Sequence, residues 1–294
     1  MSIKENPIAS SITLNGQRYN IISDIQRLYA DTPAGFRLSY EQVRWPYRPE
    51  DVSMYEWQSS RILGADANNF KHGALTVGEA RWLMKQQNNS DSEIKFDKDD
   101  QEIICAISQM HDTPEGLTKK GDVPYEKKTL QDVKNEELVM GRGIIEALGD
   151  SGDNRYLAYW VNYYLSEEGI KKTIIGEFFN AVEKFGYVRT GLQAWKKSRE
   201  FINSRPILSD NLTLIANNVL INNLPTLIKY SSKYVGIKTY LQIQKDTIDQ
   251  AFAMDPSYMD KYDDKSKIPG YKIGFERSKS KWIEWKTKNA NMLK

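Results

Sequence analysis

Apolar residues recur at helical spacing over most of this chain, whereas convincing strand patterns are scarce. Just after His72, for example, apolar positions repeat every three to four residues, the period of an amphipathic helix. Because side chains alternate with period 2 in strands and 3.6 in helices, this spacing predicts an all-α protein. Further helical patterns cover residues 102–110, 134–148, 153–165, 171–195, 212–229 and 237–254.

Glycines and polar residues suggest where these helices begin and end. The pattern over 171–195 contains Gly186 and Gly191, which predict a break in the helix. Asp210-Asn211 lies before the pattern at 212–229 and is expected to supply its N-cap.

The two ends of the chain differ from this helical middle. Ile12 to Gly16 predicts a short strand, in which Asn15-Gly16 is a hairpin turn signal. Residues 31–56 are rich in Pro, Gly, Tyr and Trp, which predicts irregular structure. We therefore expect four segments: an N-terminal extension (1–56), a core (57–200), additional helices (201–260) and a basic tail (261–294).

Composition restricts the location and the class of protein. The 294 residues contain no apolar run of about 18, so we expect no membrane span. The N-terminus shows no apolar secretory signal either. Cys105 is the only cysteine and falls in an apolar run, which predicts a small core residue. A reducing, cytoplasmic location fits this cysteine usage.

Charge is balanced overall but uneven along the chain. The formal net charge of +2 creates no global field that favours nucleic acid, so we do not expect a nucleic-acid partner. From Lys261 onward, however, the chain contains ten Lys/Arg residues and only four Asp/Glu residues. This tail is interpreted either as a solvated terminal segment or as a surface that contacts phosphates.

The chain has only two histidines, and one of them precedes an aspartate directly. His72 opens one predicted helix, and His111-Asp112 closes another. Imidazole and carboxylate together suit divalent Mn, Fe, Co, Ni or Zn. Our hypothesis is that both histidines and Asp112 bind one metal ion. The alternative for His72 alone is a capping or surface role.

The surrounding residues carry a resemblance to a known family. His72, then His111-Asp112 with Glu115, and then Gly121-Asp122-Val123-Pro124, resemble the HD-domain phosphohydrolases. The branch of this family that the motif most resembles contains bacterial 5′-deoxynucleotidases and related phage nucleotide hydrolases. The resemblance covers residues 57–195. It implies an HD-type helical bundle, a divalent metal cofactor (Mn, Co, Mg, Fe, Ni or Zn) and a nucleotide substrate, a deoxynucleoside mono- or triphosphate that loses phosphate.

The same resemblance implies roles for single residues. His72, His111 and Asp112 take the positions of metal ligands. Glu115 takes that of a catalytic acid or base, and Asp122 that of a contact to the sugar hydroxyl. The alternatives are a surface charge at a helix end for Glu115 and an ordinary turn residue for Asp122.

Three basic residues are candidates for substrate binding. Lys128 lies at the family's downstream lysine spacing, and Lys127 is adjacent to it. Arg61 lies upstream of His72, and a guanidinium can bind phosphate oxygens in a bidentate manner. The alternative for all three is a solvated surface charge.

The sequence departs from the family's pattern at two places. Lys119-Lys120 is inserted before Gly121 and is expected to reshape the loop over the substrate. Asn180 stands where the family has its final metal-binding aspartate, and Glu183 stands where a glutamate follows. A neutral amide oxygen is a weaker donor than a carboxylate. We therefore expect weaker metal binding, use of Glu183, or loss of catalysis.

These departures leave rival functions open. One is a non-catalytic HD-fold module that binds a nucleotide or a partner protein. Another is a nuclease or phosphodiesterase of the wider superfamily, supported only by the basic tail. The aromatic cluster Tyr159, Trp160, Tyr163 and Tyr164 is interpreted as core packing, with base stacking as the alternative. Residues 200–294 are candidates for extra helices or for a homo-oligomer interface.

Overall fold

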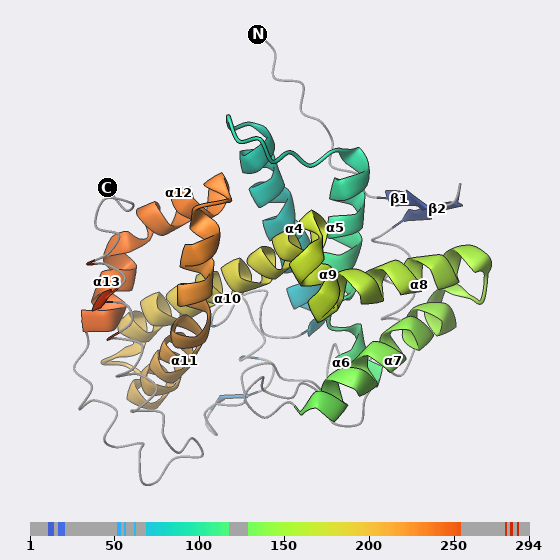
Figure 1. The fold of residues 1–294 in the computed structure, drawn as a ribbon. Coiled ribbons are helices and arrows are strands. Elements are labelled where there is room, and N and C mark those ends of the chain that lie inside the picture. The colour runs from blue at the N-terminus through green and yellow to red at the C-terminus, as the bar shows by residue number, and fades with distance from the viewer. Residues whose placement is uncertain are drawn as a thin grey trace. The chain divides into compact units, whose positions relative to one another are not determined.

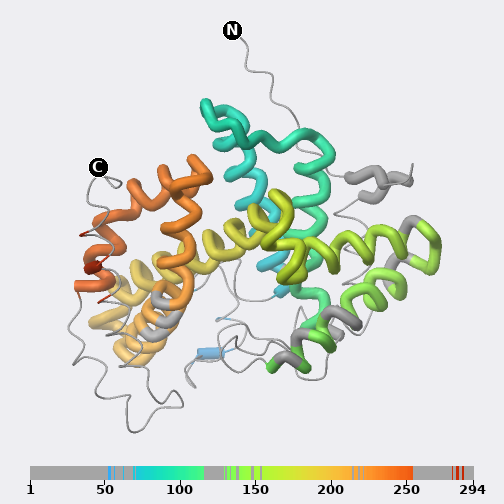
Figure 2. Tube along the Cα trace, viewed as in Figure 1, coloured from blue at the N-terminus to red at the C-terminus, as the bar shows by residue number. Residues whose placement is uncertain are grey.

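The computed structural model describes two short strands and ten helices over residues 11–14, 17–20, 69–117 and 129–253 (Figures 1 and 2). It also describes isolated positions at 52, 53, 56, 62, 280, 283, 284 and 287. The all-α prediction is confirmed for this part of the chain, with one small exception. Strands β1 (Ser11–Leu14) and β2 (Gln17–Asn20) pair antiparallel, with Leu14 opposite Gln17. They flank the Asn15-Gly16 pair that the sequence marks as a turn signal.

Contacts divide the chain into two compact units, which are described separately. The first comprises residues 1–44 and 65–182, and the second comprises residues 45–64 and 183–294. The division falls within one helix, after Val182, whereas the sequence places a boundary after residue 200. The candidate metal ligands His72, His111, Asp112 and Asn180 belong to the first unit, whereas Glu183 is counted with the second.

Three helices of the first unit carry the candidate site. Helix α4 (Asn69–Asn88) packs against α5 (Lys98–Met110), and the short α6 (Thr113–Leu117) follows α5 directly. A capping box fixes the start of α5, because Asp97 accepts a hydrogen bond from the Asp100 backbone and the Asp100 side chain accepts one in return. His111 is the C-cap of α5.

Capping residues also fix the positions at which the next three helices begin. Helix α7 (Leu130–Leu148) begins after Thr129, α8 (Gly152–Leu165) after Ser151, and α9 (Glu167–Lys172) after Ser166. In each case the cap hydroxyl accepts a backbone N–H of the first turn. Helix α7 packs against α6 and α8.

Helix α10 (Ile174–Phe201) is continuous, so the predicted break at Gly186 and Gly191 is wrong. Both glycines are buried, and a Cβ at Gly191 would lie 3.2–3.3 Å from side-chain atoms of Val219 and Leu220. Glycine here permits the close approach of another helix and does not end its own. Gly191 therefore lowers the intrinsic helix propensity of α10 but permits close packing against Val219 and Leu220.

The remaining helices belong to the second unit. They are α11 (Pro206–Ser231), α12 (Val235–Ile243) and α13 (Lys245–Ala253). The N-cap predicted at Asp210-Asn211 is wrong, because α11 already begins at Pro206, where the missing backbone N–H of proline is tolerated. No helix among the described residues is both long enough and apolar enough to cross a membrane.

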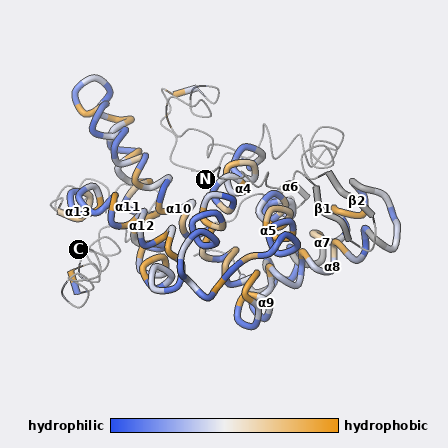
Figure 3. Tube along the Cα trace, turned by 90° about the horizontal axis from the view of Figure 1, so that it is seen from above, coloured by the Kyte–Doolittle hydropathy of each residue, from blue (hydrophilic) through white to orange (hydrophobic). Residues whose placement is uncertain are grey.

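Buried apolar side chains form the core of the first unit. Figure 3 shows apolar positions recurring between polar ones along the helices, as the sequence spacing predicts. Phe96 and Phe178 are 2% and 0% exposed, and their ring centroids lie 4.3 Å apart. Cys105 is fully buried on α5, which confirms its prediction as a core residue. Burial raises the pKa of its thiol, partly offset by Arg81.

Candidate metal centre

The two histidines of the chain lie side by side although 39 residues separate them. His72 lies in the first turn of α4, and His111 and Asp112 lie between α5 and α6. Their side chains are 3%, 6% and 12% exposed, respectively. Since polar groups are rarely buried without partners, the gathering of three here indicates a built arrangement.

His111 Nε2 is the common point of this cluster. It lies 3.1 Å from His72 Nε2 and 3.3 Å from Asp112 Oδ1. His72 Nε2 in turn lies 3.8 Å from Asp112 Oδ2. Among the described residues, these three form the group whose ligand atoms all lie within 4.8 Å of one another. The sequence hypothesis that joins both histidines and Asp112 is consistent with this geometry.

The tautomer of His111 follows from its second ring nitrogen. His111 Nδ1 lies 2.8 Å from the Ser108 carbonyl oxygen, which can only accept a hydrogen bond. Nδ1 therefore carries the proton, and in the neutral ring the Nε2 lone pair points at His72 and Asp112. A backbone carbonyl on the distal nitrogen is a frequent arrangement for metal-binding histidines.

The distances suit a shared cation. Two imidazole nitrogens 3.1 Å apart subtend about 100° at an ion bound to each at about 2.0–2.1 Å. That angle lies between the octahedral and tetrahedral values, so it does not select one geometry. The donor set of two imidazoles and one carboxylate suits Mn, Fe, Co, Ni or Zn.

The first half of α10 packs beside His111. The Phe179 ring is 3% exposed and meets the His111 ring edge-on, with centroids 5.3 Å apart. Asn180 is the next residue of this helix and is half-buried. Adjacent helical residues point about 100° apart, so α10 brings Asn180 into the neighbourhood of the cluster without settling its contact. Its role as a ligand stays a prediction.

Glu183 follows one turn later and is counted with the second unit. Its Oε2 lies 3.6 Å from Lys184 Nζ, at side-chain exposures of 26% and 25%. Partly exposed pairs of this kind contribute about 0–1 kcal/mol. The role of Glu183 as an alternative ligand stays a prediction.

Glu115 is held by a residue that sequence reasoning missed. The Asn69 side-chain amide donates a short hydrogen bond to Glu115 Oε2, and both residues are buried at 0% and 8% exposure. Glu115 lies in α6, and its backbone N–H donates to the Asp112 carbonyl at 3.1 Å. The alternative of a surface charge for Glu115 is therefore wrong. No motif marks Asn69 in the sequence, although its place three residues before His72 puts both on one face of α4.

The other predicted site residues lie outside the described part of the chain. They are Arg61, Asp122, Lys127 and Lys128. The inserted Lys119-Lys120 and most of the basic tail share that status. Their roles stay predictions.

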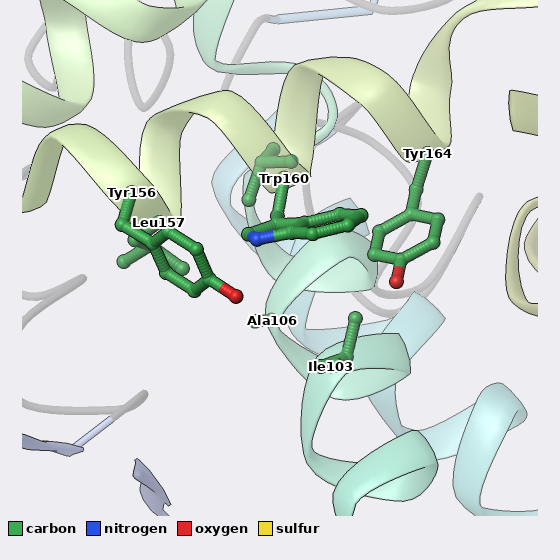
Figure 4. Close-up of a pocket in the computed structure, with 7 residues that line it drawn as sticks. Ile103, Ala106, Tyr156, Leu157, Trp160 and Tyr164 are labelled. Carbon is green, nitrogen blue, oxygen red and sulfur yellow. The ribbon is translucent and has the colours of Figure 1, made fainter. Parts of the chain in front are cut away.

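Two members of the aromatic cluster of α8, Trp160 and Tyr164, line a small pocket against α5 (Figure 4). Tyr159 is 60% exposed, so the interpretation of the cluster as core packing is wrong for this residue. Trp160 contacts Tyr156 edge-on and stacks on Tyr164, with centroids 5.8 and 5.4 Å apart. The volume is about 110 Å³, below the roughly 300 Å³ at which small-molecule pockets begin. This size favours packing over binding of a nucleobase with its sugar and phosphate. Apolar neighbours complete the wall: Ile103, Ala106, Leu157 and Val161.

Comparison of the chain with protein-family models, curated proteins and solved structures finds no match.

Proposed function

We propose that this chain is a metal-dependent phosphohydrolase that removes phosphate from a nucleotide, a deoxynucleoside mono- or triphosphate. The observation that supports it most is the convergence of His72, His111 and Asp112, with the His111 lone pair directed into the group. The resemblance to the HD-domain family supplies the substrate class. The location that we propose is cytoplasmic, as cysteine usage suggests.

The residues divide the chemistry between them. His72, His111 and Asp112 hold the cation, with Asn180 or Glu183 as the further donor. A bound divalent cation supplies Lewis-acid chemistry, which stabilises charge that develops on the phosphate oxygens. The protein fixes the donors before binding, because Ser108 sets the His111 tautomer and Phe179 packs against its ring.

Glu115 carries the proton transfer in this proposal. It lies one helical turn from Asp112, which corresponds to a rise of about 5 Å. From there its carboxylate orients and deprotonates the attacking water, or protonates the leaving oxygen. Asp122 contacts the sugar hydroxyl, and Arg61, Lys127 and Lys128 balance the phosphate charge.

A phosphate-release screen tests the proposal. Purified protein is incubated with each dNMP and dNTP in the presence of Mn²⁺, Co²⁺ or Mg²⁺, and its metal content is measured alongside. We expect metal-dependent release that falls to background in His111→Ala. A Glu168→Gln variant, altered in an exposed ion pair of α9, serves as the matched control and keeps full activity. Undiminished release in His111→Ala would contradict the proposal.

A second function is favoured by one residue. Asn180 offers a neutral amide where the resembling family has a carboxylate, so the cluster carries one negative charge fewer. Such a site binds a cation less tightly, which suits a non-catalytic module that binds a nucleotide or a partner protein.

Restoring the carboxylate distinguishes the two functions. In Asn180→Asp, a large gain in phosphate release indicates a hydrolase weakened by its ligand set. Tighter metal binding with no release of phosphate from any nucleotide favours the binding module.

A further inference from the structure

Asn69 joins the two halves of the candidate site from the start of α4. It is the first residue of that helix and is fully buried, and its partner Glu115 is 46 residues away in sequence. A buried side-chain amide in such a position needs a partner, because an unsatisfied one costs free energy. Here the partner is the carboxylate assigned to proton transfer.

The hydrogen bond between Asn69 and Glu115 joins the same two segments as the metal cluster, one helical turn away from it. His72 lies three residues after Asn69 on α4, and Glu115 lies three residues after Asp112. The same two segments therefore meet twice, through His72 with Asp112 at 3.8 Å and through Asn69 with Glu115. One contact sets the position of the metal donors, and the other sets the carboxylate relative to them.

The direction of the hydrogen bond matters for the chemistry. An amide N–H donates only, so Asn69 holds one oxygen of Glu115 as an acceptor. A glutamate side chain has considerable rotamer freedom, and this bond restricts it to one orientation. The chemical step depends on such orientation, because small misplacements of a reacting group lower the rate strongly.

We propose that Asn69 is a positioning residue, which acts on the reaction by fixing the Glu115 carboxylate beside the metal donors. This inference rests on the proposed phosphohydrolase function. It assigns to Asn69 no contact with the metal ion or with the substrate.

A double-mutant cycle tests the inference. Four proteins are compared for turnover, KM, metal content and thermal stability: wild type, Asn69→Asp, Glu115→Gln and the double variant. Asn69→Asp keeps the shape of the side chain but faces Glu115 with a second acceptor. We expect kcat to fall about 100-fold, in the range for general acid–base groups. KM and metal content should stay within about twofold, since Asn69 touches neither ligand nor metal in the proposal.

The double variant separates an effect on the orientation of residue 115 from an effect on the stability of the fold. It exchanges amide and carboxylate across the same contact, so the hydrogen bond can form again and thermal stability should recover. Turnover should stay at the level of Glu115→Gln alone, because the carboxylate now stands on α4. A turnover loss from Asn69→Asp that is equally large in the Glu115→Gln background would overturn the inference, as would loss of bound metal in Asn69→Asp.

Gln87→Ala is the matched structural control. Gln87 is a fully buried amide near the other end of α4, where it donates to Ser92 Oγ at 2.7 Å. We expect a loss of stability with kcat unchanged; an equal fall in kcat would assign the Asn69 effect to general destabilisation and refute positioning. If wild type releases no phosphate from any nucleotide, the proposed function fails, and with it the positioning role. The stability measurements still report separately whether residues 69 and 115 are paired.

Discussion

Metal binding should stabilise the folded protein through the His72–His111–Asp112 cluster, and His111→Ala should remove most of the effect. His111 Nε2 takes part in both of the shortest distances in the cluster, 3.1 and 3.3 Å. Its loss leaves His72 and Asp112, whose nearest atoms lie 3.8 Å apart. The unfolded chain cannot keep these donors together, since His72 and His111 are 39 residues apart in sequence.

The size of the effect follows from linkage. A ligand present at about 100 times its Kd stabilises the native state by about 2.7 kcal/mol, which raises Tm by roughly 5–11 °C for a domain of this size. The assay is thermal unfolding at increasing Mn²⁺, Co²⁺ or Zn²⁺, compared with the chelated protein. The shift should grow with the logarithm of metal concentration above Kd.

Two variants make this measurement specific. Glu168→Gln should retain the shift, because its carboxylate pairs with Lys172 on an exposed face of α9. His111→Ala should lose it. An equal shift in His111→Ala would mean that the metal binds elsewhere, and it would refute the reasoning that places the cation at this cluster.

Four further predictions concern packing and charge in the fold. Phe178→Ala should cost about 3–5 kcal/mol in chemical denaturation, because the ring is fully buried. Gly78→Ala should stabilise by about 0.5–1 kcal/mol, since no atom lies near the added methyl group. Gly176→Ala should instead destabilise by about 1–3 kcal/mol, because its Cβ would lie 2.6 Å from a backbone oxygen of α9; equal Tm values would contradict the packing. The hydrogen bond from Arg155 lowers the pKa of the Asp150 carboxyl, so its contribution to stability is present above the ordinary aspartate pKa and is lost as pH falls through the lowered value. An NMR titration should show the Asp150 midpoint rising in Arg155→Ala, and an unmoved midpoint would contradict the assignment.

Helix type could be predicted from sequence, whereas helix limits depended on neighbours that the sequence does not show. Apolar spacing predicts α4, which buries one face, whereas α5 is a short apolar run that is buried on all sides from Ile104 to Met110. Gly191 has the signature of a helix breaker in sequence, yet in the fold it lies against Val219 and Leu220 within a continuous helix. The same residue type serves both purposes, and only the packing partner decides between them.

The candidate site divides in the same way. His72 and His111-Asp112 were predictable because imidazole is rare in this chain and its chemistry is specific. Asn69 was not, because asparagine is common and its partner Glu115 comes from a distant helix. The contact of the Ser108 carbonyl with His111 could not be predicted either. Every residue carries a backbone carbonyl, and only the end of the helix directs this one at His111.

The end of α5 and the start of α4 have an electrostatic consequence. Helix α5 ends at Met110 with His111 as its cap, so the C-terminal end of its macrodipole lies at one of the proposed cation donors. That end carries about half a negative elementary charge, which favours a cation there. Helix α4 begins at Asn69, and its positive end lies beside the Glu115 carboxylate. His72 also lies in the first turn of α4, so the two helix ends act in opposite senses here: the end of α5 favours a cation, and the start of α4 favours anionic oxygens.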